Sequence, residues 1–416
     1  MSFPPVVTPS AEALLAPRQE QRVLPGLERI ERALAALGHP EQRFASALVL
    51  GTNGKGSTAA LLEGILRAHG ARTGLYTSPH LLRVEERIRV AGERIAPGEL
   101  RELVAGLVRF PELSYFETLT AAALQHFADR GVALAVLEAG LGGRWDATRA
   151  AAPAVTLLTN VGTDHASWLG PTRLHVAREK AAALGGRAAI VGAWDDEVEA
   201  TIREHAAADV PLSLAADWAS VTAGADGAVR FRVDGVAGSA ALRLAGRHQL
   251  DNLKLALAGA AALARAGLLP RLDPEAVRRG IEGVRWPGRL DWRAWRGRRL
   301  LLDGAHNREA VAALVDALPD AGLSEPPHLL FSCLDDKPLG AMADLLRPHV
   351  CSVTVAPLAS PRATPLAALA AAFPGCRACP DLAAAVDGLP TDVPVLVTGS
   401  LRLVGAVLEL IGGIDD

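Results

Sequence analysis

A glycine-rich turn near the N-terminus has the residue types needed to hold phosphate. The segment Gly51–Ser57 reads GTNGKGS, follows an apolar run and opens a helix-like stretch. Glycines let backbone N–H groups approach an anion, a helix N-terminus adds partial positive charge, and Lys55 adds a full charge. In the common phosphate-loop pattern serine or threonine follows the lysine at once, whereas here Gly56 intervenes. The segment predicts a phosphate site of a variant kind, with an ordinary strand-to-helix turn as the alternative.

Two further segments carry charged residues that could complete such a site. Glu138 ends an apolar run just before the turn residues AGLGG, so its carboxylate is expected at the carboxyl edge of a parallel sheet, where ligands bind. A carboxylate oxygen there suits Mg²⁺. Asp164, His165 and Lys180 follow within one later segment. Each of these side chains alone could be structural or solvated, but beside a phosphate loop they favour one site for phosphate and metal.

The elements that must position these residues alternate along the chain. Short runs rich in Val, Leu and Ala alternate with longer helix-like segments, which is typical of a parallel sheet covered by helices. We expect strands at 47–50, 73–77, 132–137, 154–159 and 188–191, a small antiparallel addition within 221–244 and a helix over 250–266. The segment 284–299, dense in Trp, Arg, Pro and Gly, breaks the alternation and is expected to join two domains. Strand-like runs beyond it predict a second, smaller α/β unit.

Composition narrows the classes of protein to which the chain could belong. Apolar residues make up 50% of its 416 residues, charged residues 21%, and the formal net charge is -3, so no overall basic charge favours nucleic-acid binding. The sequence shows neither a signal-peptide pattern nor an uncharged apolar run of about 18 residues, and we expect a cytoplasmic protein without membrane contact. Cys376 and Cys379 form a C-x-x-C pattern without a second pair at zinc-ribbon spacing, so structural cysteines are expected.

Six ordered motifs together resemble a known family. They are GTNGKGST, YTSPHLLRVEERIRV, LEAGLGGRWDAT, DHASWLGPTRLHVAREKAA, WPGRL and LDGAHN. The sequence resembles the folylpolyglutamate synthase/dihydrofolate synthase family, a branch of the Mur ligase superfamily, from about Leu24 to the C-terminus. The family's phosphate loop reads G-T-N-G-K-G-[ST], which accounts for the displaced serine. The resemblance implies a P-loop-containing parallel-sheet ATPase domain that also binds folate, expected at 1–288, and a smaller α/β glutamate-ligase domain at 289–416.

The resemblance also implies a reaction. ATP transfers its γ-phosphate to a folate carboxylate, and the amine of L-glutamate attacks the resulting acyl phosphate to form an amide. Because two anions approach each other, metal ions and lysine are expected to supply much of the catalysis. The expected substrates are ATP, L-glutamate and either dihydropteroate or a reduced folate. The expected cofactor is Mg²⁺, with or without a second cation, in a monomer that binds neither nucleic acid nor membrane.

Matching the motifs position by position assigns expected roles to individual residues. Catalysis is expected from Lys55, from a carbamylated Lys180 that helps to organise metal, and from His306 beside the phosphates or the incoming glutamate. The expected metal ligands are Ser78, Glu138 and His165. The expected ATP contacts are Asn53, Gly54, Lys55, Gly56, Ser57, Asn252, Arg289 and Asp303. The expected pterin contacts are Leu24, Pro25, Gly26, Tyr115, Phe116, Glu117, Trp145, Asp146 and Ala147, with Asp146 as the polar anchor.

Three positions depart from the family pattern, and they bear on which substrate is used. Trp145 replaces a common leucine, Arg149 an asparagine and Arg308 a proline, and the first two border the expected pterin pocket. We expect a bifunctional enzyme that uses dihydropteroate and also extends reduced folates, with an extension-only folylpolyglutamate synthase as the alternative. A cell-wall Mur ligase would need a further domain before Gly51. A nucleotide-dependent switch would leave Lys180 and the DGAHN motif unexplained.

Overall fold

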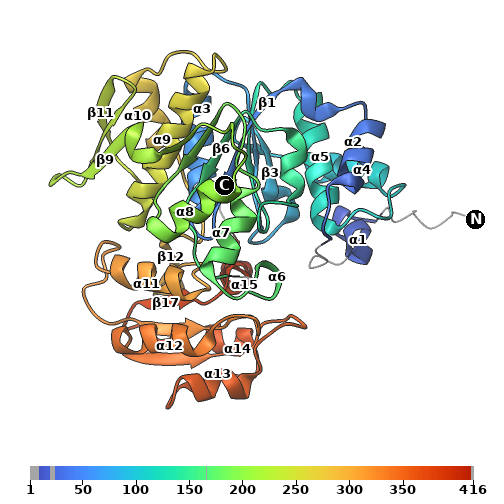
Figure 1. The fold of residues 1–416 in the computed structure, drawn as a ribbon. Coiled ribbons are helices and arrows are strands. Elements are labelled where there is room, and N and C mark those ends of the chain that lie inside the picture. Colours follow the sequence, from blue (N-terminus) through green and yellow to red (C-terminus); the bar gives the residue numbers. More distant parts are fainter. Residues whose placement is uncertain (1–8, 19–23, 165, 414–416) are drawn as a thin grey trace, which may run out of the picture.

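A mainly parallel sheet forms the centre of the first part of the chain (Figure 1). Within residues 9–18, 24–164 and 166–413, which the computed structural model describes, this sheet has eight strands in the order β4-β3-β2-β5-β1-β6-β7-β8. Its strands are β1 (Ala45–Leu50), β2 (Thr73–Tyr76), β3 (Ile88–Val90), β4 (Glu93–Arg94), β5 (Leu134–Glu138), β6 (Val155–Leu158), β7 (Ala188–Val191) and β8 (Leu212–Leu214). Only β3 pairs antiparallel, with β2 and β4, among the strand pairs of this described sheet.

Alternation of buried residues gives this sheet two apolar faces. In β1, Leu48 and Leu50 belong to one face, Ala47 and Val49 to the other, and all four are buried. The first face packs against α1 (Ala11–Leu15), α2 (Glu28–Ala36), α4 (Pro97–Leu107), α5 (Tyr115–Asp129), α7 (Arg173–Ala181) and α8 (Asp196–His205). The second face packs against α3 (Lys55–Ala68), α9 (His248–Arg265) and α10 (Pro274–Glu282). Helices therefore cover both faces, as Figure 1 shows.

A small antiparallel sheet extends the second face. Within the described residues it has three strands, β9 (Ala219–Ala223), β10 (Val229–Val233) and β11 (Val236–Ala240), in the order β11-β10-β9. Alternate residues of β10 are buried in the same apolar cluster as α9, whereas Arg230 and Arg232 between them are exposed. The antiparallel addition predicted within 221–244 is present but spans 219–240, because residues 241–244 form no strand, and the helix predicted over 250–266 is α9.

A second, smaller sheet follows. Its order is β12-β13-β17-β14-β15-β16, and it is parallel except for the pair of β12 and β13. The strands are β12 (Asp291–Trp295), β13 (Arg298–Leu302), β14 (His328–Phe331), β15 (Ser352–Val355), β16 (Arg377–Ala378) and β17 (Val395–Thr398). One face packs against α11 (Arg308–Ala317), α12 (Leu339–Leu346) and α13 (Leu366–Ala372). The other packs against α14 (Leu382–Asp387) and α15 (Leu401–Ile411).

The predicted α/β class with a smaller second α/β domain is confirmed, but the expected joint at 284–299 is partly wrong. From Asp291 onward this segment forms β12 and the start of β13. Arg296 and Gly297 both have positive φ, at 46° and 76°, as a tight two-residue hairpin turn requires. The Trp and Arg residues that broke the alternation belong to this hairpin, where the Arg299 guanidinium stacks over the Trp292 ring. The division at 288/289 stays a prediction.

The two parts of the chain meet closely at α15. A Cβ placed on Gly405 would lie 2.1 Å from the carbonyl oxygen of Leu81, which follows β2 in the first part of the chain. Leu81 and Leu82 also pack against the apolar cluster that contains α14 and α15. Because no Cβ fits at that distance, the two parts approach through bare backbone at Gly405.

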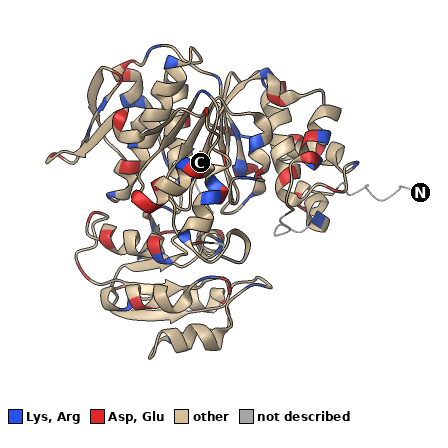
Figure 2. Cartoon of the chain, viewed as in Figure 1, with Lys and Arg blue, Asp and Glu red and all other residues tan. Residues whose placement is uncertain are grey.

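Charge distribution, helix composition and the positions of the cysteines bear on other classes of protein. In Figure 2 Lys and Arg residues and Asp and Glu residues are interspersed along the visible ribbon. No helix among the described residues is long and apolar enough to cross a membrane. All four cysteines are free, and Cys376 packs on the opposite face of the second sheet from Cys379. This pair therefore does not converge on a common ligand.

Candidate active site

The predicted site residues of the first domain gather at the carboxyl ends of neighbouring parallel strands. The phosphate loop follows β1, Glu138 ends β5, Ser78 follows β2, and residues 159–164 follow β6. Because β2, β5, β1 and β6 are adjacent in the sheet, these segments lie together at one edge. The topology thus collects residues separated by as many as 113 positions, from Gly51 to Asp164.

Two glycines shape the phosphate loop between β1 and α3. Gly51 and Gly54 have φ of 144° and 83°, a region that other residues rarely adopt. A Cβ on Gly51 would lie 1.8 Å from Thr159 Oγ1, and one on Gly54 would lie 2.3 Å from Asn252 Oδ1. The loop needs glycine at both positions, because any other residue would place a Cβ atom into these contacts.

Lys55 and Lys180 both point at this loop. Lys55 Nζ donates to the carbonyl oxygens of Gly51 and Thr52, each at 3.1 Å. Lys180, which is buried in α7, donates to the same Gly51 oxygen at 2.9 Å and to Gly142 at 3.4 Å. Burial, reinforced by the nearby charge of Lys55, lowers the pKa of Lys180 to about 7. Near neutral pH the amine of Lys180 is therefore partly uncharged.

Glu138 is the buried carboxylate of this cluster. Its Oε2 accepts a hydrogen bond from the backbone N–H of Ser78 at 2.9 Å. Burial raises the pKa of Glu138, while Lys55 and the Ser78 hydrogen bond oppose that rise. A Cβ on Gly56 would lie 3.4 Å from Glu138 Oε2, so the carboxylate stands against the first turn of α3. Ser57, in the same turn, is buried.

The donor set fits a hard divalent cation. Ser78, Glu138, Lys55 and Lys180 line one cavity of about 140 Å³ at the phosphate loop. A buried carboxylate beside a serine residue offers the oxygen ligands that Mg²⁺ prefers. His165, the third predicted ligand, lies outside the described residues. Among the residues described, no group of three or more His, Cys, Asp or Glu side chains is arranged around a common point.

A second cavity opens on the other side of the phosphate loop. It has a volume of about 340 Å³, and the predicted ATP-contact residues that line it are Asn53, Gly54, Ser57, Asn252, Arg289 and Asp303. Asn252 is buried, accepts from Thr58 Oγ1 at 3.4 Å and donates to Gln249 Oε1 at 2.8 Å. Asp303 accepts backbone N–H bonds from Leu290 and Ala305. Residues of both sheets thus enclose this space.

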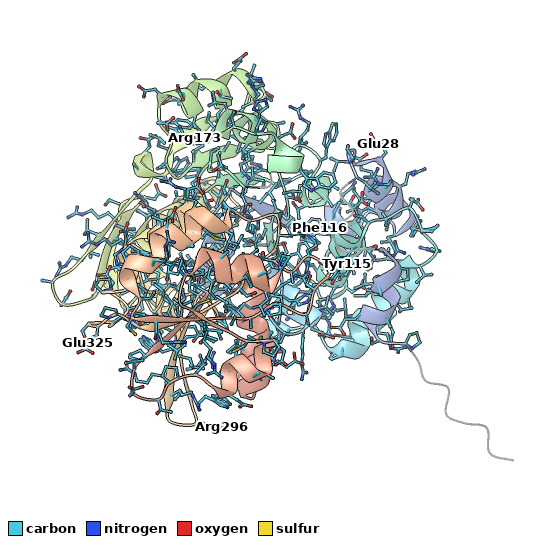
Figure 3. The ribbon with its side chains drawn as sticks, turned by 90° about the horizontal axis from the view of Figure 1, so that it is seen from below. Glu28, Tyr115, Phe116, Arg173, Arg296 and Glu325 are labelled. Carbon is cyan, nitrogen blue, oxygen red and sulfur yellow. The ribbon has the colours of Figure 1, made fainter. Side chains whose placement is uncertain are left out.

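A third and larger cavity contains most of the predicted pterin contacts. It measures about 520 Å³, within the range of ligand pockets. The predicted residues that line it are Leu24, Tyr115, Phe116, Glu117, Trp145, Asp146 and Ala147. Figure 3 shows Tyr115 and Phe116 together toward the interior of the molecule, with Glu28 at its periphery. Trp145 is half exposed, so its ring forms part of the cavity wall without filling it.

Pro25 and Gly26 are not among the residues that line this cavity, but they are tied to it. Arg29 donates to the carbonyl oxygens of Leu24, Pro25 and Gly26. Its guanidinium also pairs with Glu117 at 3.0 Å. Glu117 in turn accepts the Ser114 N–H at 2.7 Å at the start of α5. One arginine therefore fixes the loop 24–26 against the helix that carries Tyr115 and Phe116.

Asp146, the predicted polar anchor, is occupied by its own loop. Its Oδ2 accepts from the N–H groups of Gly140 and Leu141, and its Oδ1 from the N–H and hydroxyl of Thr148. These four donors fill the acceptor sites of a carboxylate. Asp146 lines the large cavity, but in this structure its carboxylate organises the turn after Glu138.

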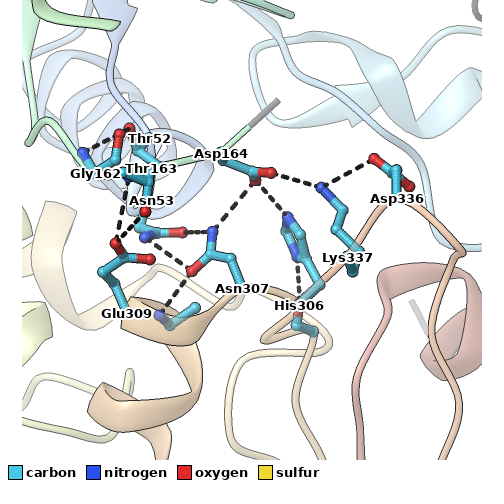
Figure 4. A network of polar contacts seen from close by, with 12 residues as sticks. Thr52, Asn53, Gly162, Thr163, Asp164, His306, Asn307, Glu309, Asp336 and Lys337 are labelled. Carbon is cyan, nitrogen blue, oxygen red and sulfur yellow. Dashed lines mark hydrogen bonds and ion pairs between the residues drawn. The ribbon is translucent and has the colours of Figure 1, made fainter. Parts of the chain in front are cut away.

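Residues that the sequence did not single out support the phosphate loop from within the first domain and, through Asn307 and Lys337, join the two domains (Figure 4). Asn160 Oδ1 accepts the Asn53 N–H at 3.0 Å. Asn307 exchanges amide hydrogen bonds with Asn53. Lys337 Nζ lies 2.7 Å from Asp164 Oδ1, and both side chains are nearly buried. Asn307 stands inside the LDGAHN motif and could have been proposed, whereas Lys337 lies in a segment without a recognised pattern.

His306 lies where the second domain meets the loop after β6. Its Nδ1 lies 2.8 Å from the Gly304 carbonyl oxygen, and its Nε2 lies 3.6 Å from Asp164 Oδ2. The residue lines all three cavities described above. The large cavity and the cavity of about 340 Å³ therefore both reach the phosphate-loop cavity beside His306.

Comparison with known proteins agrees with this architecture. The Mur ligase middle domain matches residues 49–260, and the Mur ligase glutamate ligase domain matches residues 288–401. A probable bifunctional folylpolyglutamate synthase/dihydropteroate synthase of Haloferax volcanii is 36% identical over 80% of this chain, which spans about two fifths (41%) of that relative's length. A dihydrofolate synthase/folylpolyglutamate synthase of Mycobacterium tuberculosis is 33% identical over 90% of this chain and 83% of its own length.

A solved structure is similar across both domains. The Escherichia coli FolC protein in complex with DHPP and ADP has a TM-score of 0.83 and 29% identity, covering 97% of this chain and 99% of that one. Sequence relatives, domain matches and this structure agree from the phosphate loop to the end of the second sheet. The chain belongs to the folylpolyglutamate synthase/dihydrofolate synthase family of the Mur ligase superfamily.

Proposed function

We propose that this chain joins L-glutamate to the carboxylate of a pterin-containing acid, with ATP activating that carboxylate as an acyl phosphate. The observation that carries the proposal is the position of His306, which lines the nucleotide-side cavity, the phosphate-loop cavity and the large apolar cavity. An acid bound in the large cavity and a nucleotide bound in the nucleotide-side cavity would bring their reacting ends to the same place. Proximity of this kind supplies much of the rate of a two-substrate reaction.

The charged residues suit transfer of phosphate between two anions. Lys55 would leave the Gly51 and Thr52 carbonyls for the outer phosphates, because a phosphate is a stronger acceptor for an ammonium than a neutral carbonyl is. Ser78 and Glu138, with His165, would hold Mg²⁺, which when bound neutralises charge on the phosphates. We further propose that Lys180 is carbamylated, because its buried amine has a pKa of about 7 and reaches the phosphate loop.

We propose that the pterin ring occupies the large cavity against Tyr115, Phe116 and Leu24. Phe116 is tilted against Tyr76 with ring centroids 5.7 Å apart, which supports an aromatic floor there. The structural relative that was solved with DHPP and ADP supports paired binding of a pterin acid and a nucleotide in this family. The proposal includes both activities, use of dihydropteroate and extension of reduced folates, in a cytoplasmic monomer.

One assay tests the proposal. Purified protein is incubated with ATP, Mg²⁺ and L-glutamate, together with either dihydropteroate or tetrahydrofolate, and products are identified by mass. We expect a product one glutamate heavier with each acid, and ADP release that depends on both the acid and glutamate. If product formed from tetrahydrofolate but not from dihydropteroate, only the proposed extension activity would stand. No glutamate-dependent product from either acid would contradict the proposed function.

A further inference from the structure

Asn307 is fully buried, and its side chain uses its whole hydrogen-bonding capacity. Its Oδ1 accepts from the Ala310 N–H at 2.8 Å, which caps the start of α11, and from Asn53 Nδ2 at 3.3 Å. Its Nδ2 donates to Asn53 Oδ1 at 2.9 Å and to Asp164 Oδ2 at 3.3 Å. One side chain therefore caps a helix of the second domain and holds two loops of the first.

The two loops that Asn307 holds are those on which the proposed chemistry depends. Asn53 lies within the phosphate loop, and Asp164 directly precedes His165, the third predicted metal ligand. Asp164 is also bound by Lys337 at 2.7 Å and lies 3.6 Å from His306, both from the second domain. Figure 4 shows Asn307 at the centre of this network, between Asn53 on one side and His306 on the other.

A second contact joins α11 of the second domain to the loop after β6 of the first domain. Glu309, in the first turn of α11, accepts from the Thr163 hydroxyl at 2.8 Å and from the Thr163 N–H at 3.3 Å. Thr163 is the neighbour of Asp164, so α11 holds this loop at two successive residues. The N-terminus of α11 is thus fastened to the first domain through side chains that are themselves fixed by the helix.

We propose that Asn307 is a positioning residue for phosphoryl transfer, which holds the phosphate loop and the loop after β6 in register with the second domain. This inference rests on the proposed function, and it assigns Asn307 no contact with substrate. The amide pair engages the side chain of Asn53, whose backbone N–H is bonded to Asn160, and leaves the first turn of α3 to face the anion. Without the amide pair of Asn307 and Asn53, His306 and Arg289 would no longer be fixed relative to Lys55, although all three side chains would still be present in the protein.

Two substitutions separate this role from helix capping. Asn307→Asp keeps an acceptor for the Ala310 N–H but removes the Nδ2 donor and places a second carboxylate beside Asp164. Asn307→Ser keeps a favoured capping residue but is too short to reach Asn53. The matched control is Asp381→Asn, which changes the equivalent capping side chain of α14, where Asp381 accepts the Ala384 N–H at 2.8 Å.

Two measurements are made on the full chain of each variant. Steady-state kinetics with ATP give kcat and KM, and hydrogen exchange without nucleotide reports the opening of segments 51–57 and 160–164. We expect both Asn307 variants to lower kcat on the order of 100-fold, the effect of misplacing a reacting group by about 1 Å, with little change in KM for ATP. We expect faster exchange in both segments, and neither change in Asp381→Asn.

Each possible result of these two measurements supports or contradicts the proposed role of Asn307. Unchanged exchange in both segments would overturn the proposal, whatever happens to kcat, because a residue that acted directly on the substrate would alter kcat alone. Unchanged kcat with faster exchange would also overturn it, since the register of the loops would then not govern transfer. If the wild-type chain showed no glutamate-dependent turnover, the proposed function would fail. The exchange result would then still show whether Asn307 holds the two loops.

Discussion

At the scale of single residues, the most informative feature is one carbonyl oxygen shared by two lysines. Gly51 O accepts from both Lys55 and Lys180, so two ammonium groups converge where phosphate is expected. Their mutual repulsion, added to burial, lowers the pKa of Lys180. Sequence spacing could place both residues in one site, but the shared acceptor depends on the packing of α7 against the phosphate loop.

Lys55→Ala should abolish ADP formation and leave the fold intact. The substitution removes a charge expected against the outer phosphates, whereas the loop keeps its glycines and its hydrogen bonds to Thr159 and Asn160. We expect kcat to fall by at least about 100-fold, as for loss of one group that stabilises a charged transition state. Circular dichroism and thermal melting provide the control for folding. Near-normal turnover by folded Lys55→Ala protein would contradict the assignment of residues 51–57 as a phosphate loop.

Lys180 should acquire a carbamate as pH rises through about 7. A carbamate forms from the neutral amine and carbon dioxide, and the lowered pKa makes that amine mostly neutral above about 7 and mostly protonated below it. Incubation with ¹³C-labelled bicarbonate should give a carbamate NMR signal that grows over this interval and is absent from Lys180→Met. Activity should follow the same profile, and Lys180→Ala should recover part of it with added short carboxylates. A wild-type chain that is active without any carbamate signal would refute the modification.

At the scale of elements, the central strands of the first sheet could be predicted because their apolar runs are continuous and buried on both faces. The strands that were not anticipated, β3, β4, β8, β12 and β16, are short or lie at sheet edges, where polar residues interrupt the pattern. The hairpin of β12 and β13 was taken for a joint because Trp and Arg residues dominate it. Their apolar rings pack under guanidinium groups, a pairing that periodicity does not reveal.

Arg29→Ala should weaken binding of the pterin acid. Arg29 of α2 joins the loop 24–26 to Glu117 of α5, and losing these buried hydrogen bonds costs roughly 1–3 kcal/mol. We expect KM for the acid to rise about tenfold or more, since 1.4 kcal/mol corresponds to a factor of ten, with KM for ATP unchanged. Arg32→Ala is the matched control one turn later, because Arg32 is 68% exposed and pairs only loosely with Glu112. Equal KM values for the two variants would contradict this role.

At the scale of the whole molecule, the candidate site belongs to neither domain alone. The phosphate loop and Glu138 come from the first sheet, while Arg289, Asp303 and His306 come from the second part of the chain. The motifs could be predicted to converge because each follows a strand. Their partners Asn160 and Lys337 could not, because Asn160 acts only through the packing of the loop after β6 on the phosphate loop, and Lys337 only through the way in which the domains face each other.

Separate chains 1–288 and 289–416 should each fold but form no ADP. Each contains its own apolar clusters, whereas the nucleotide cavity has lining residues from both. We expect weak ATP binding by 1–288, measured by calorimetry, and no glutamate-dependent ADP release by either chain alone. Partial activity on mixing would locate the boundary near 288/289. Full turnover by 1–288 alone would show that the second domain is dispensable for the chemistry.

The contact at Gly405 has a consequence for how this protein can evolve. Elsewhere in the contact between the two parts of the chain, a changed side chain can be matched by a change in the side chain that it touches. At Gly405 the partner is the carbonyl oxygen of Leu81, a backbone atom that every amino acid has. No second mutation at position 81 can therefore restore the fit after a first one at position 405. Sequences that descend from this one should therefore vary freely on either side of this contact. Position 405 should remain glycine in all of them.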